Sequence, residues 1–457
     1  MLCLSGGQVE SLWDELLPVG VRELPQDLAA LDVLLGDPAL LLPIASCWRA
    51  EAVGRGRPTS SMESYVRLMV VKQRSGWGYE TLVREVSDSL HLRRFCLVAL
   101  GERVPHESTV RKLTRRLGGE VIEELTRVVI AKAQHETRFK ARAVRIDSTV
   151  VEADVRYPTD SGLALDSARV LARQARKLGG MVGRDAGWVR DRSRAIGRRV
   201  RSMSRTLGRR TGERKQEVLD LTAQAGRLVE RSIGEAKRMV ALARTRARGR
   251  GARAKLRQAE RLQEFIERAT RVTVQIKQRI RGERIPDRLV SIFDPDARPI
   301  RKGKLGKPNE FGFVAQLCEV TENTKPGARG LILPAAIQLG NPQENQLLPK
   351  TVAELERLAL APKEIALDGG FQSGPTDEAL ERLAPERTFI AGRQQPGSRR
   401  TQRRMARYRT GIEGRISHLK RGYGLRRSRL KGAPAAKAWT AWAILAYNLD
   451  TLAIRAS

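Results

Sequence analysis

The stretch "RAVRIDSTVVEADV", residues 142–155, decides the fold, because it is rich in β-branched residues and partly alternates apolar with polar side chains. It predicts a β-strand that carries Asp147 inside an otherwise apolar run. Later strand patterns are "DRLVSIFD" (287–294), "EFGFVAQLCEVTE" (310–322), "KEIALDGG" (363–370) and "RTFIAG" (387–392). Helical patterns surround all of them, so we expect an α/β fold built on a mixed sheet.

The segment 161–285, between the first two strand patterns, is predicted to be helical throughout. Its two apolar stripes are narrow, and the other faces are rich in Arg. The stretch "ARTRARGRGARAK" separates the stripes and is typical of the tip of an antiparallel hairpin. We therefore expect a basic helical hairpin inserted into the sheet domain.

These patterns divide the chain into three parts, of which the insertion 161–285 is one. Residues 1–138 are mostly helical and are predicted to form an N-terminal domain with a role in DNA-end binding or dimerisation. Residues 139–160 and 286–457 are predicted to form one α/β domain, because strand patterns flank the insertion on both sides.

The charge of the chain is its most unusual property, with a formal net charge of +34 over 457 residues. Residues 171–290 contain 34 Lys and Arg against 12 Asp and Glu, and residues 393–432 contain 14 against one. The excess therefore lies in two segments, which is typical of a binding surface for nucleic acid. The alternative is that both segments are simply solvated basic faces.

Other features exclude several classes of protein. The four cysteines and four histidines show no metal-ligand spacing and no disulfide framework. No apolar run approaches the roughly 20 residues of a membrane-spanning helix. The start, "MLCLSGGQVE", lacks the regions of a signal peptide. We expect a cytoplasmic protein with no membrane partner.

Three acids stand out by position: Asp147 in the first strand, Asp368 at the end of a later strand, and Glu413 inside the second basic segment. Each also has a purely structural interpretation. Asp often ends a strand or begins a turn, and a lone exposed Glu reduces the charge repulsion along a basic helix. Together they match a two-metal phosphotransfer site, in which carboxylates from separate elements converge on two divalent cations about 3.5–4 Å apart.

The helix expected around Glu413 supports the metal interpretation. At about 100° per residue, Arg409, Glu413 and Lys420 share one helix face within about 40°. A carboxylate flanked in this way can bind a metal ion while both basic side chains bind phosphates beside it.

Three blocks of the sequence resemble the catalytic blocks of DDE-type bacterial insertion-sequence transposases. They are "RIDSTVVEADV" (145–155), "IALDGGFQS" (365–373) and "YRTGIEGRISHLKRGYGLRRSRLKG" (408–432). The stretch "SMESYVRLMVVKQRSGWGYETLVREVSDSLHLRRF" (61–95) is similar to the helical N-terminal domain of this group.

The resemblance implies an RNase H-like catalytic domain in which Asp147, Asp368 and Glu413 bind two Mg²⁺, for which Mn²⁺ can substitute. The family signature is Tyr-x2-Arg-x3-Glu-x6-Lys, and Arg409, Glu413 and Lys420 match it. Ala406 stands at the Tyr position, with Tyr408 two residues later. The residues expected to bind DNA are Arg409, Lys420, Arg415 and Arg421.

The expected function is DNA transposition. Water attacks a phosphodiester at the end of the element, and the freed 3′-hydroxyl then attacks target DNA. The expected partners are double-stranded DNA, as terminal inverted repeats and target, and further copies of the chain in a dimer or larger assembly at the bacterial nucleoid. Two alternatives remain: an RNase H-like nuclease that only hydrolyses, and a non-catalytic nucleic-acid organiser.

Overall fold

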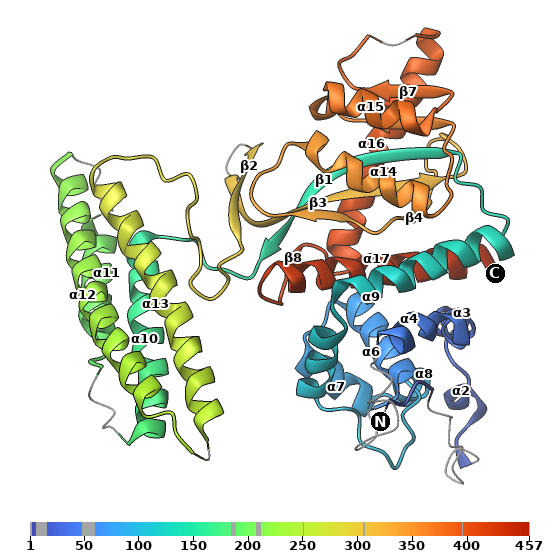
Figure 1. Ribbon diagram of the computed structural model, residues 1–457. Coiled ribbons are helices and arrows are strands. Elements are labelled where there is room, and N and C mark those ends of the chain that lie inside the picture. The colour runs from blue at the N-terminus through green and yellow to red at the C-terminus, as the bar shows by residue number, and fades with distance from the viewer. Residues whose placement is uncertain are drawn as a thin grey trace. The chain divides into compact units, whose positions relative to one another are not determined.

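The computed structural model describes residues 2–5, 16–47, 60–183, 189–206, 212–249, 251–304, 307–394 and 396–456. The chain divides into two compact units (Figure 1). One comprises Met1–Asp154 and Gly312–Ser457, and the other comprises Val155–Phe311. The three predicted acids lie in the first unit and the helical insertion lies in the second. The division into three parts, with the N-terminal helices as a separate domain, stays a prediction.

A mixed sheet, with its main strands in the order β2-β3-β1-β6-β7, carries two of the predicted acids. Strand β1 (Ala143–Ala153) is antiparallel to β3 (Lys307–Thr321) and parallel to β6 (Glu364–Leu367), which in turn is parallel to β7 (Arg387–Ile390). The other strands are β2 (Arg298–Lys304), β4 (Leu331–Ile332), β5 (Ala336–Gln338) and β8 (Arg427–Ser428). The α/β fold class is confirmed.

Four of the five predicted strands are present, and one is wrong. Residues 287–294 form no strand, although they contain an apolar run. Leu289 and Ile292 are instead buried against the helices of the insertion. The apolar residues in this segment therefore serve helix packing, which sequence periodicity alone does not distinguish from a short buried strand.

The N-terminal helices share one hydrophobic core with the sheet and with the C-terminal helix α17 (Ala433–Ala456). Helices α6 (Met62–Ser75) and α9 (Glu107–Glu136) both pack against α17. The ring of Trp442 on α17 is fully buried and meets the ring of Tyr65 on α6 edge to face, with centroids 5.7 Å apart. The other helices of the first unit are α2 (Val19–Arg22), α3 (Gln26–Leu35), η1 (Pro38–Leu41), α4 (Leu42–Ser46), α7 (Tyr79–Asp88), α8 (Leu90–Phe95), η3 (Glu344–Gln346), α14 (Leu348–Arg357), η4 (Gly369–Phe371), α15 (Gly374–Leu383) and α16 (Arg399–Gly422).

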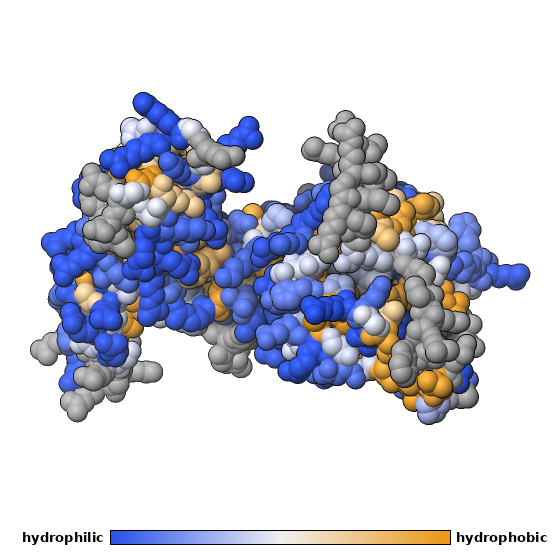
Figure 2. Space-filling view, turned by 90° about the horizontal axis from the view of Figure 1, so that it is seen from below, coloured by the Kyte–Doolittle hydropathy of each residue, from blue (hydrophilic) through white to orange (hydrophobic). Residues whose placement is uncertain are grey.

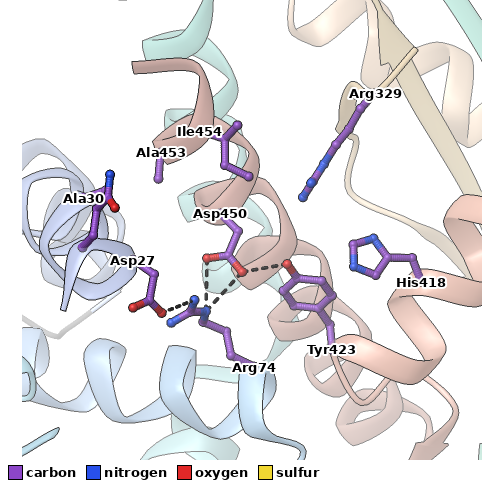
Figure 3. Close-up of a pocket in the computed structure, with 10 residues that line it drawn as sticks. Asp27, Ala30, Arg74, Arg329, His418, Tyr423, Asp450, Ala453 and Ile454 are labelled. Atoms are coloured by element: carbon purple, nitrogen blue, oxygen red, sulfur yellow. Dashed lines mark hydrogen bonds and ion pairs between the residues drawn. The ribbon is translucent and has the colours of Figure 1, made fainter. Parts of the chain in front are cut away.

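Polar contacts also join the N-terminal helices to α17, at a pocket lined by α3, α6 and α17 (Figure 3). Arg74 of α6 forms ion pairs with Asp27 of α3 at 2.8 Å and with Asp450 of α17 at 3.1 Å. The hydroxyl of Tyr423, which directly follows α16, donates to Asp450 at 2.6 Å. The end of α16 is therefore tied to the same helices that hold the N-terminal region.

The described part of the second unit contains four helices: α10 (Asp160–Val182), α11 (Ser193–Thr206), α12 (Gly212–Thr245) and α13 (Ala252–Ile280). They pack around a hydrophobic core of their own, which includes Leu171, Val229 and Leu262. We expected a hairpin of two helices. Helices α10 and α11 extend α12 and α13 into a bundle, because their apolar faces contribute to the same core. Hydrophilic side chains cover most of the face of this unit visible in Figure 2.

Among the described residues, no single helix is long and apolar enough to cross a membrane. The bent pair Gln26–Leu35 and Pro38–Ser46 meets the length and composition criteria only when its two helices are taken together.

Candidate active site

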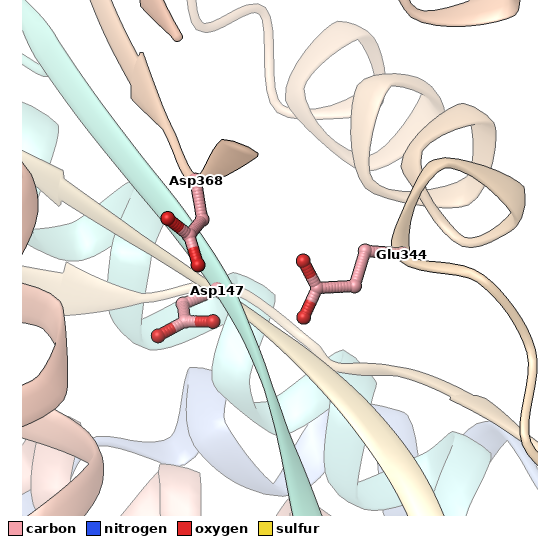
Figure 4. A group of neighbouring side chains, drawn as sticks. All are labelled: Asp147, Glu344 and Asp368. Carbon is pink, nitrogen blue, oxygen red and sulfur yellow. The ribbon is translucent and has the colours of Figure 1, made fainter. Parts of the chain in front are cut away.

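Three carboxylates converge at the end of strand β6 (Figure 4). Asp147 comes from β1, Asp368 directly follows β6, and Glu344 is the first residue of η3. One oxygen of each lies within 4.8 Å of an oxygen of the other two, and all three residues are half-buried. The structure thus brings together two of the predicted acids, Asp147 and Asp368, with a third that the sequence analysis did not select.

The strand register explains why the two aspartates meet. The parallel pairing of β1 with β6 places Ile146 opposite Leu367, so the next residues, Asp147 and Asp368, lie beside each other. Every residue of β1 except Asp147 is buried. The backbone N–H of Ser148 donates to Asp147 Oδ1 at 2.7 Å and orients this carboxylate.

Glu344 reaches the cluster from a short turn that a buried side chain fixes in place. Gln316 on β3 donates through Nε2 to the carbonyl oxygen of Glu344 at 2.8 Å, and the Thr351 hydroxyl donates to Gln316 Oε1 at 2.6 Å. Gly370 leaves room for the Glu344 side chain, since a Cβ at this position would lie 2.5 Å from Glu344 Oε2. Alanine there would push the carboxylate aside.

Glu413, the third predicted acid, lies on α16 and is linked to the cluster through Arg409. Nη1 of Arg409 lies 3.2 Å from Asp368 Oδ1 and 3.3 Å from Glu413 Oε1. The side chain of Glu413 is 61% exposed, and that of Asp368 is 42% exposed. Glu413 therefore lies at the solvent-exposed edge of the cluster, and Arg409 lies between it and Asp368.

A buried ion-pair network fixes α16 beside the sheet. Glu319 on β3 has no exposed surface and forms ion pairs with Arg145 of β1 at 2.6 Å and with Arg415 of α16 at 2.9 Å. Nη1 of Arg145 also donates to the carbonyl oxygen of Tyr408 at 3.0 Å. Gly411 permits this approach, because a Cβ there would lie 1.8 Å from Arg145 Nη1.

The other residues predicted to bind DNA differ in their surroundings. Arg421 is exposed and Lys420 is half-buried, both near the end of α16. Arg415, by contrast, is only 13% exposed and is engaged with Glu319, so its placement does not support a contact with DNA phosphate. Tyr408 points into the core, where its hydroxyl lies 2.6 Å from that of Thr321, and burial raises the pKa of this hydroxyl above its ordinary value.

The donor set fits a divalent cation. Carboxylates held this close repel one another unless a cation lies between them, and anionic oxygens are the ligands that hard divalent cations prefer. Asp147, Asp368 and Glu344 would hold such an ion, with Glu413 available from the open side. A bound divalent cation supplies the positive charge that activates an attacking oxygen and stabilises the leaving one.

The sequence contained only a weak signal for Glu344. It lies in "QENQLLPK", where an acid at the start of a helix is the ordinary choice for helix stability. Nothing in the local pattern indicates that the turn folds back onto the end of β6. The pairing of β5 with β3, through Ala315 and Ile337, brings the following turn to the site.

Comparison with known protein families gives two matches. Residues 26–116 match a transposase domain (DUF772), and residues 326–449 match a transposase DDE domain. The second match contains Glu344, Asp368, Arg409 and Glu413, and Asp147 lies before it. Comparisons with curated proteins and with solved structures found no match.

The DDE domain implies catalysis that depends on a divalent metal, and the transposase domains imply binding to DNA. Both properties agree with the cluster of carboxylates beside a strongly basic helix. Both matches support a DDE-type insertion-sequence transposase, an enzyme of metal-dependent phosphodiester chemistry on DNA.

Proposed function

We propose that Asp147, Asp368 and Glu413 hold two Mg²⁺ ions, and that the chain cleaves double-stranded DNA at the terminal inverted repeats of its element and joins the freed 3′-hydroxyl to target DNA. The observation that carries this proposal is the position of Asp147 and Asp368, side by side on parallel strands with Glu344 within 4.8 Å. Glu344 is a fourth carboxylate of the same site.

The residues around the carboxylates have distinct tasks in this proposal. Arg409 and Lys420 bind the phosphates on either side of the scissile bond, since both project from the helix that carries Glu413. The guanidinium of Arg409 suits a bidentate contact with phosphate, whereas Lys420 acts as a point charge. Exposed Arg421 extends this surface along the DNA backbone.

The wider assembly follows from the chemistry. The basic residues of the insertion bind the DNA backbone outside the site, and the N-terminal helices bind element ends or a second copy of the chain. Two DNA ends must be brought together, so the working form on DNA is a dimer or a larger assembly. Such an enzyme works at the nucleoid in the bacterial cytoplasm.

A cleavage and strand-transfer assay on labelled DNA from the ends of the encoding element tests this proposal. With Mg²⁺ we expect the wild-type chain to cleave and join, and we expect EDTA to abolish both steps. Glu413→Gln keeps the shape of the side chain but removes its charge, so cleavage should be lost while DNA binding persists. Glu378→Gln is the matched control, because Glu378 is an exposed acid on α15.

Each other result has a distinct meaning. Full activity in Glu413→Gln together with loss of activity in Glu344→Gln would assign the third acid to Glu344. Cleavage without joined products under all conditions would favour a nuclease that only hydrolyses. No cleavage by the wild-type chain with any divalent cation would contradict the proposal.

A further inference from the structure

Arg409 occupies the space between two of the four carboxylates. A single nitrogen, Nη1, contacts Asp368 Oδ1 at 3.2 Å and Glu413 Oε1 at 3.3 Å. The arginine side chain is only 16% exposed, although Glu413 is largely open to solvent. The guanidinium therefore already places one positive charge between the two carboxylates that a second cation would use.

The four carboxylates form two groups that share Asp368. Asp147, Glu344 and Asp368 form a compact group with oxygens within 4.8 Å of one another, whereas Glu413 meets Asp368 through Arg409. Mg²⁺ binds oxygen at about 2.1 Å, closer than either contact of the arginine. A cation bound between Asp368 and Glu413 would need the space that the guanidinium of Arg409 fills. The cation and the guanidinium therefore cannot occupy this space together.

The backbone around Arg409 is fixed, so only its side chain is free to change position. On one side, the carbonyl oxygen of Tyr408 accepts from Arg145 at 3.0 Å. On the other side, Arg415 is held by buried Glu319 at 2.9 Å. Between these two anchors the long arginine side chain has several rotatable bonds, and its planar guanidinium matches a phosphate group well.

We propose that Arg409 blocks the second cation site in the free chain and leaves it when a DNA phosphate attracts its guanidinium. The inference rests on the proposed function, because it takes these carboxylates to be cation ligands. The free chain then binds one divalent cation at Asp147, Glu344 and Asp368. The second cation binds between Asp368 and Glu413 only together with DNA, so the complete site forms on the substrate.

Counting Mn²⁺ bound to the DNA-free chain, by the electron paramagnetic resonance signal of free Mn²⁺, tests this without an activity readout. We expect one tightly bound Mn²⁺ in the wild-type chain. In Arg409→Gln we expect a second Mn²⁺ that the wild-type chain does not hold under the same conditions, because removing a positive charge next to the site raises its affinity at least about tenfold. Arg407→Gln is the matched control, since Arg407 is an exposed arginine on the same helix, and it should behave as wild type.

Two further variants locate the sites. Adding Glu413→Gln to Arg409→Gln should remove the second ion and retain the first. Asp147→Asn should weaken the first ion. Thermal melts and circular dichroism confirm that each variant is folded before its metal content is interpreted.

The outcomes separate this inference from the proposed function. Two equally tight Mn²⁺ ions in the wild-type chain, or an unchanged titration in Arg409→Gln, would overturn the blocking role and leave the metal site intact. No bound Mn²⁺ in wild type or in Arg409→Gln would overturn the inference and the proposed metal site together.

Discussion

Asp147→Asn is expected to lower DNA cleavage by on the order of 10³-fold or more, with folding and DNA binding preserved. The change keeps the shape of the side chain and removes its negative charge. A metal ligand contributes several kcal/mol to stabilising the charge that develops in the transition state, and each 1.36 kcal/mol is about a factor of ten in rate. Single-turnover cleavage of labelled DNA with Mg²⁺ measures the effect.

The matched control is Asp154→Asn, because Asp154 is an exposed aspartate directly after the same strand. We expect its cleavage rate to equal that of wild type. Asp368→Asn should resemble Asp147→Asn, since the register of β1 with β6 places the two carboxylates beside each other. An Asp147→Asn chain that cleaves within about tenfold of the wild-type rate would show that this carboxylate does not bind the catalytic metal.

Glu319→Gln is expected to destabilise the fold by about 3–5 kcal/mol, because it leaves buried arginines without their counter-charge. Glu319 is fully buried, Arg145 is almost fully buried, and the two are 2.6 Å apart. The same carboxylate accepts from the backbone N–H of Gly330 at 3.0 Å and pairs with Arg415 of α16. Urea denaturation followed by circular dichroism measures the loss.

Glu356→Gln makes the same change in an exposed ion pair. Glu356 pairs with Arg382 at 2.6 Å, but the two side chains are 40% and 56% exposed, so the change should cost under about 1 kcal/mol. Equal stability losses in the two variants would contradict the view that the buried network holds α16 against the sheet.

The two aspartates of the site were predictable from sequence because each is marked by its own strand. Asp147 interrupts an apolar β-branched run, and Asp368 ends a short strand before two glycines. A strand pattern depends only on residues that are neighbours in the sequence, so it can be recognised without the structure. That the two strands are neighbours and parallel, with Ile146 opposite Leu367, follows only from the tertiary fold.

The remaining features depend on contacts between distant segments. Glu344 joins the cluster because its turn packs against the turn after β6, and no local pattern marks that meeting. Arg415 resembles a surface cation in a basic helix, yet its buried partner Glu319 lies on a distant strand. The two additional helices of the insertion have apolar faces that were recognisable only once their shared core was known.

Anomalous X-ray scattering from crystals of the chain grown with Mn²⁺ shows whether the carboxylates beside β6 bind a divalent cation. Metal binding at this site predicts an anomalous peak within about 2.0–2.3 Å of oxygens from both Asp147 and Asp368. A clear peak elsewhere in the crystal, with none between these two carboxylates, would contradict it.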